Sequence, residues 1–131
     1  MVVDNKVLDE LSAKAKASER LRCNFDMRNS ADDQSQRMLN ALEPGTFMPI
    51  HRHHGSSETV VLIRGKINWV FYDENGRETE SVLLDANGEN RMLVAEKDRW
   101  HSLECLESGS VLYESKDGPY RPLEKDEIWK G

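Results

Sequence analysis

A succession of short strand-like runs is the feature that most constrains the fold of this chain. From Arg37 onward, apolar and β-branched residues gather into short segments bounded by Gly, Asn, Asp, Pro or Glu-rich breaks. The runs are RMLNALE, TFMPIHRH, ETVVLIRG, KINWVFYDE, ETESVLLD, NRMLVAE, WHSLECLE and SVLYESK. Strand after strand at this spacing predicts an all-β sandwich or barrel.

The segments before the strands have a different pattern. Apolar residues recur at helical spacing from Lys6 to Leu21, which predicts a short amphipathic helix with Asp4 or Asn5 as its N-cap. The stretch from Cys23 to Gln36 is rich in Asn, Asp and Ser and predicts a connection.

Turn signals divide the later part of the chain. Asn75-Gly76, between two strand-like runs, is the strongest hairpin signal in the sequence. Gly118 and two prolines follow Lys116 and are expected to end the last strand. We expect the acidic ending LEKDEIWKG to be a solvated tail, with Trp129 against the body or a neighbour.

The length of 131 residues predicts one domain over residues 1–131. We expect the helix and connection in residues 1–36, the barrel in 37–116 and the tail in 117–131. Several runs, such as ETVVLIRG, are apolar on both faces, so a sheet face is expected to be covered by the helix or by a second subunit. A homodimer is the prediction.

Composition and charge exclude some classes of function. A formal net charge of -6 without a concentrated basic segment argues against a nucleic-acid partner. No apolar run has the length of a membrane span, and the opening MVVDNKVLDELS does not resemble a secretory signal, so we expect a cytoplasmic protein. Cys23 and Cys105 are expected to be reduced structural thiols.

Three of the four histidines lie in the stretch PIHRHHGSSET. His51 and His53 alternate, so a strand would point both imidazoles to one face, and a turn at Gly55 could bring Glu58 opposite them. His101 is the only other histidine, and a distant strand of a barrel could bring it in. These four side chains predict a site for one divalent transition metal, namely zinc, iron, manganese or nickel.

The alternative to a metal site is a polar loop. His, Arg, Ser and Glu are ordinary loop residues, and His101 could be a half-buried histidine beside Trp100. A purely structural metal is a further alternative, but closed structural sites usually contain cysteine, which the stretch lacks. We expect His54 to be a surface residue.

The spacing of these residues resembles the cupin family. Gly45, His51, His53, Glu58 and Gly65 match the first cupin motif at every fixed position and every gap. Of the second cupin motif only His101 is present. The resemblance implies a cupin double-stranded β-helix, which is a jelly-roll barrel, with a metal held by His51, His53, Glu58 and His101.

From about Asn24 through WHSLECLESGSVLYESKDGPY, the chain also resembles the WbuC family of cupin-fold metalloproteins. That likeness supports His101 and implies that Glu114, Lys116 and Tyr120 lie near the mouth of the barrel, as tentative catalytic groups. It also implies a link to surface-polysaccharide (O-antigen) biosynthesis but names no reaction. Arg64 and Asn40 are further candidates for orienting a ligand, with paired surface charge as the alternative. Trp69, Phe71 and Tyr72 are expected in the core or an interface.

The hypothesis for function is a cupin metalloprotein that binds or converts a small hydroxylated or carboxylated molecule, such as a sugar or sugar nucleotide. If it is an enzyme, Tyr120, Lys116 or Glu114 would transfer protons near the metal. An iron-dependent dioxygenase and a non-catalytic metal-dependent binding protein or sensor are the alternatives. A metal-free epimerase is disfavoured, because nearly every histidine is already assigned to the metal.

Overall fold

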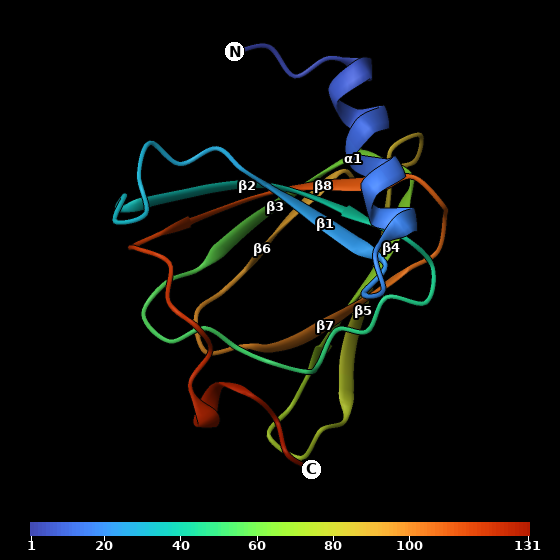
Figure 1. Cartoon of the computed structure of the whole chain (residues 1–131). Helices are drawn as coiled ribbons and strands as arrows, with labels where there is room; N and C mark the ends of the chain where they lie inside the picture. The colour runs from blue at the N-terminus through green and yellow to red at the C-terminus, as the bar shows by residue number, and fades with distance from the viewer.

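The computed structural model describes all residues from 1 to 131 (Figure 1). It contains one α-helix, eight strands and one 3-10 helix. In chain order these are α1 (Asn5–Ala17), β1 (Arg22–Asp26), β2 (Ser35–Leu42), β3 (Glu58–Arg64), β4 (Lys66–Tyr72), β5 (Glu78–Asp85), β6 (Met92–Ala95), β7 (Trp100–Cys105), β8 (Ser110–Asp117) and η1 (Lys125–Glu127). None of its helices has the length and apolarity needed to cross a bilayer.

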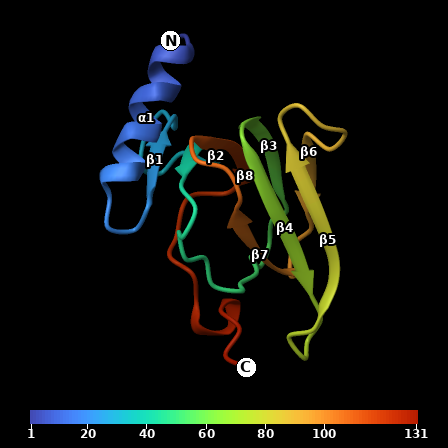
Figure 2. The ribbon, with the colours of Figure 1, turned by 90° about the vertical axis from the view of Figure 1, so that its right-hand side faces the viewer.

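Two antiparallel sheets face each other around the core (Figures 1 and 2). One sheet has the order β1-β2-β8-β3-β6 and the other the order β5-β4-β7. Val60 and Leu112 of the first sheet and Trp69 and Phe71 of the second belong to one buried cluster. This arrangement confirms the prediction of an all-β jelly-roll barrel with a short N-terminal helix.

Helix α1 packs on the five-stranded sheet at the end formed by β1 and β2 (Figure 2). The side chain of Asp4 accepts a hydrogen bond from the amide of Val7 and caps the helix, as predicted. One face of the helix is apolar and packs on β2 and β8 in a second core cluster, which comprises Leu8, Leu11, Ala15, Leu39, Ala41 and Val111. The helix ends at Ala17, before the predicted end at Leu21.

The predicted connection from Cys23 to Gln36 is wrong over its first part, because Arg22–Asp26 forms strand β1. Its residues pair antiparallel with β2, with Asn24 opposite Asn40. Phe25 packs against the cluster beneath α1. Sheet pairing and burial of Phe25 therefore outweigh the turn preference of Asn and Asp in this segment.

The predicted strand TFMPIHRH is also wrong, because only His51 in it forms β-bridges. Its amide donates to the carbonyl of His101 and its carbonyl accepts from the amide of His101. The next amide, of Arg52, donates instead to the carbonyl of Glu127 in the C-terminal segment. The extended chain is thus shared between two partners, and neither pairing continues long enough to make a strand.

The expectation of a solvated tail in LEKDEIWKG, residues 123–131, is corrected by the position of Glu127, which has no exposed surface. The amide of Trp129 donates to the carbonyl of Ile50, so this segment pairs with the chain that carries His51. The indole of Trp129 lies against Gly76 in the predicted β4–β5 hairpin, which is present. Trp129 therefore packs on the body of the domain.

Part of the outer sheet surface remains uncovered beyond α1. Ile63 of β3 and Met92 and Val94 of β6 are between 40% and 55% exposed. These side chains are compatible with a second subunit, and the homodimer stays a prediction.

Gly65 provides a test of this packing. Its φ is +85°, and a Cβ there would lie 2.1 Å from the hydroxyl of Ser110 and 2.8 Å from its Cα. Gly109 has a similar φ of +82° but open space around the Cβ position. Gly109→Ala should lower the free energy of unfolding by about 1 kcal/mol, because only backbone strain is introduced. Gly65→Ala should lower it by about 3 kcal/mol or more, because the clash with Ser110 adds to the strain. Urea denaturation measures both, and equal losses would contradict the packing described.

Candidate metal centre

Three imidazoles converge at one end of the barrel. His51 and His53 lie on the extended segment before β3, and His101 lies on β7. One nitrogen from each ring lies within 4.8 Å of the other two. The backbone bridge between His51 and His101 brings their ring centroids to 4.3 Å. The structure therefore brings together three of the four predicted ligands.

The hydrogen bonds of two of these rings fix their tautomers. The Nδ1 atom of His51 is 2.8 Å from the carbonyl of Pro49, and Nδ1 of His101 is 2.9 Å from the carbonyl of Arg99. A carbonyl only accepts, so each Nδ1 carries the proton and each Nε2 of the neutral ring has a free lone pair. Nε2 of His101 is buried and has no hydrogen-bond partner. A divalent metal fits this arrangement, since metal-bound histidines usually donate their other N–H to such an acceptor.

His53 has a different environment. Its Nδ1 lies 3.1 Å from Nζ of Lys116, and its Nε2 lies 3.5 Å from Oε2 of Glu58. An ammonium group only donates, so the charged form of Lys116 favours a proton on Nε2 of His53. Ligation through Nε2 of His53 would therefore require this contact to rearrange.

Glu58 begins β3 and is 8% exposed. It contacts His53 but does not belong to the mutually close set of three histidines. Burial, reinforced by the nearby charge of Glu114, raises the pKa of Glu58 to about 8. Its assignment as a fourth ligand remains a prediction.

Burial also keeps the imidazoles neutral. Removal from water lowers the pKa of His53 and that of His101 to about 3, and it lowers the pKa of His51 as well. The ring of His101 stacks on buried Trp69 at a centroid distance of 5.1 Å. Neutral rings are the form that binds a metal, so protons compete weakly for this site near neutral pH.

A cavity of about 360 Å³ opens beside the histidines. His51, His53 and Glu58 line it together with Glu114 and Lys116. The remaining lining residues are Asn24, Arg28, Gln36, Met38, Asn40, Met48, Trp69, Ser115, Tyr120, Arg121 and Leu123. All three predicted catalytic groups therefore line one cavity with two of the histidines.

The three predicted catalytic groups differ in exposure. Burial raises the pKa of Glu114 and lowers that of Lys116, because each charged form loses hydration. Tyr120 is 57% exposed and lies at the rim, 5.7 Å below the guanidinium of Arg28. Glu114 and Lys116 are therefore the deeper groups, and Tyr120 is the outer one.

Of the other residues that the sequence indicated, some line the cavity and some do not. Asn40 lines the cavity. Arg64 does not, since it binds Asp9 and Asn5 of α1. Trp69 and Phe71 are core residues, each 2% exposed. For Arg64 the structure therefore shows the alternative of a paired surface charge, with Asp9 of α1 as its partner.

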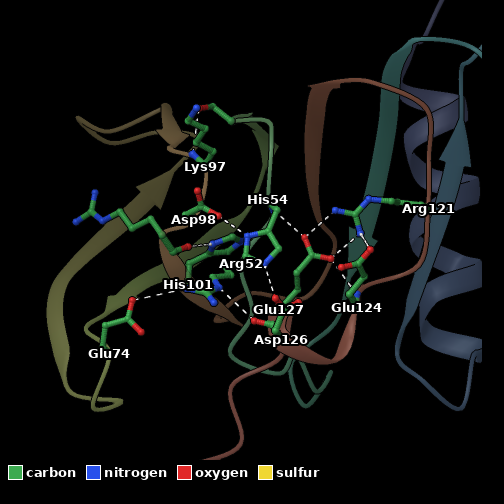
Figure 3. Close-up of polar contacts among 12 residues, drawn as sticks. Arg52, His54, Glu74, Lys97, Asp98, His101, Arg121, Glu124, Asp126 and Glu127 are labelled. Atoms are coloured by element: carbon green, nitrogen blue, oxygen red, sulfur yellow. Dashed lines mark hydrogen bonds and ion pairs between the residues drawn. The ribbon is translucent and has the colours of Figure 1, made fainter.

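The C-terminal segment contributes residues that sequence reasoning missed (Figure 3). The carboxylate of Glu127 accepts two hydrogen bonds from Arg121 and one from the amide of His54. His54 itself is partly exposed, as expected, and contacts Asp98 and Asp126. The alternation of acidic and basic residues in LEKDEIWKG resembled a solvated tail, and no sequence signal distinguished the one buried glutamate.

A family profile described as "Domain of unknown function (DUF6016)" matches residues 3–84. The chain belongs to this family. A search of curated proteins found no significant match to the chain. The family description carries no activity, so the functional argument rests on the site.

Solved structures show that the fold is that of the cupins. KdgF from Halomonas sp. is 16% identical with a TM-score of 0.59, covering 76% of this chain and 82% of KdgF. The capsular polysaccharide assembling protein CapF from Staphylococcus aureus is 17% identical with a TM-score of 0.65, covering 86% of this chain and 32% of CapF. Oxalate oxidase with the substrate analogue glycolate is 11% identical with a TM-score of 0.58, covering 78% of this chain and 53% of the oxidase.

The chain thus spans most of KdgF but only a third of CapF and half of oxalate oxidase. At these identities the likeness shows the fold alone. The closer resemblance to the WbuC family is not confirmed by these comparisons and stays a prediction.

The raised pKa of Glu58 gives a pH-dependent prediction for the protein kept metal-free with a chelator. The stabilising contribution of the protonated group is complete below its ordinary pKa of 4.5 and is lost as pH rises through about 8. Glu58→Gln keeps the shape without the charge. The difference between the Tm of the variant and the Tm of the wild type should therefore shift in favour of the variant as pH rises from 5 to 9. A Tm difference that stays constant across this range would contradict the buried position of Glu58.

Proposed function

We propose that this protein binds one divalent transition metal through His51, His53 and His101, with Glu58 as a further ligand. The observation that carries the proposal is the convergence of three neutral imidazoles, with the buried Nε2 of His101 left without a partner. A buried polar nitrogen without a partner costs about 1–3 kcal/mol, and a metal at this point would relieve that cost.

The cavity beside the histidines supports a role in binding and converting a small molecule. The bound metal would polarise an oxygen of that molecule or activate a water molecule. Glu114 and Lys116 line the cavity and would take up or supply a proton there, and Tyr120 would do so at the rim. The volume of about 360 Å³ is at the lower end for ligand cavities and suits a small molecule better than a whole sugar nucleotide.

The substrate class that we propose is a small hydroxylated or carboxylated molecule, such as a sugar of surface-polysaccharide biosynthesis. The resemblance to the WbuC family supports this, as does the structural likeness to a protein described as assembling capsular polysaccharide. The amide side chains of Asn24, Gln36 and Asn40 line the cavity and are suited to hydrogen bonds with hydroxyl groups.

The metal proposal predicts about one divalent ion per purified chain. The double variant His51→Ala/His53→Ala should lose that metal by elemental analysis, while the matched exposed change His54→Ala should keep it. His54 binds Asp98 and Asp126 and lies outside the triad. If the native protein holds no metal and takes none up on titration, the proposal is wrong.

Incubating the metal-loaded protein with a panel of sugars and small acids distinguishes an enzyme from a binding protein. We expect a product that Lys116→Met abolishes while metal content is unchanged. Thermal stabilisation without a product for any member would instead support a metal-dependent binding protein.

A further inference from the structure

Arg121 is a cavity residue that the sequence did not single out. It follows β8 in the C-terminal segment and lines the cavity with His51, His53 and Tyr120. Its side chain is 45% exposed, so it lies at the rim, where an entering ligand can reach it.

The hydrogen bonds of Arg121 occupy only one edge of its guanidinium group. Nη1 donates to Oε1 of Glu127 and to the carbonyl of Pro122, and Nη2 donates to Oε2 of Glu127. The group has five N–H donors, so Nε–H and the second Nη2–H have no protein partner. These two N–H bonds lie in the guanidinium plane and point in parallel from one edge of it. They form the second fork with which arginine binds an oxyanion through two hydrogen bonds.

Glu127 holds this fork in place. Its side chain has no exposed surface and also accepts hydrogen bonds from the amides of His54 and Glu124 (Figure 3). The backbone carbonyl of Glu127 accepts from the amide of Arg52, which ties the C-terminal segment to the histidine segment. A ligand therefore meets an arginine whose position is already fixed, which reduces the entropy cost of binding.

The charges around the cavity favour an anion. Arg28 and Lys116 line it together with Arg121, and Lys116 forms no ion pair with a carboxylate. Three basic side chains thus line one cavity in a chain whose net charge is -6, and Arg28 is paired with Asp26 and Arg121 with Glu127.

We propose that the free Nε–Nη2 edge of Arg121 binds the carboxylate of a small hydroxy acid, such as a sugar acid, whose other oxygens face the histidines. This inference rests on the proposed function and narrows its substrate class to carboxylated molecules. A planar carboxylate matches the two parallel donors, and a second basic group, Lys116, lines the same cavity.

The test compares three probes that differ only in the group at C6, namely D-glucuronate, D-glucose 6-phosphate and D-glucose. Calorimetric titration of the metal-containing protein should give at least about tenfold tighter binding of glucuronate than of glucose, equivalent to about 1.4 kcal/mol. Arg121→Lys keeps a charge next to Glu127 but loses the fork. It should reduce the preference for glucuronate over glucose by about tenfold.

Two further variants complete the test. Arg64→Lys is the matched control, because Arg64 also binds a carboxylate, that of Asp9, but lies outside the cavity, and it should leave the preference unchanged. Arg121→Gln removes the charge and should abolish the preference in protein that remains folded by circular dichroism.

The proposal is overturned if both Arg121 variants keep the preference, if no carboxylate binds the wild type at millimolar concentrations, or if glucose 6-phosphate binds more tightly than glucuronate. Elemental analysis of the same samples separates this failure from that of the metal site. Protein without metal would refute the proposed function, whereas normal metal content with no dependence on Arg121 would refute only the carboxylate subsite.

Discussion

The site depends on a pair of backbone hydrogen bonds between His51 and His101, each amide donating to the other residue's carbonyl. This bridge joins the extended segment before β3 to β7 and fixes the distance between the two imidazoles. Each ring then donates its Nδ1–H to a backbone carbonyl two residues earlier in the chain, so both Nε2 atoms are left as acceptors. The same extended segment pairs with the C-terminal residues on its other side, which brings Arg121 to the cavity rim.

The interior of the barrel has an apolar part, which forms the core, and a polar part, which forms the candidate site. One part is the apolar cluster that includes Trp69, Leu84 and Leu112. The other part is polar and holds Glu58 and Glu114 beside the histidines, although burying such groups without partners is costly. Buried titratable groups with shifted pKa values are common at functional sites, and the raised pKa of Glu58 and the lowered pKa values of His53 and His101 fit that pattern.

Much of the fold and of the site could be predicted from the sequence, because periodicity and motif spacing are local signals. The succession of strand-like runs predicted the barrel. The spacing of His51, His53, Glu58 and Gly65 predicted the cupin fold. The strand β1, the lone bridge at His51 and the burial of Glu127 could not be predicted, because each depends on a partner distant in sequence. Arg121 was missed for the same reason, since only the buried Glu127 distinguishes it from a surface arginine.

The most direct test of the central claim is X-ray absorption spectroscopy of the protein loaded with zinc at one equivalent. The account predicts three histidine nitrogens around each zinc at about 2.0–2.1 Å. It also predicts that the imidazole scattering pattern decreases when His101 is replaced by glutamine. A spectrum with only oxygen ligands, or one unchanged in His101→Gln, would show that the three imidazoles do not hold a common ion.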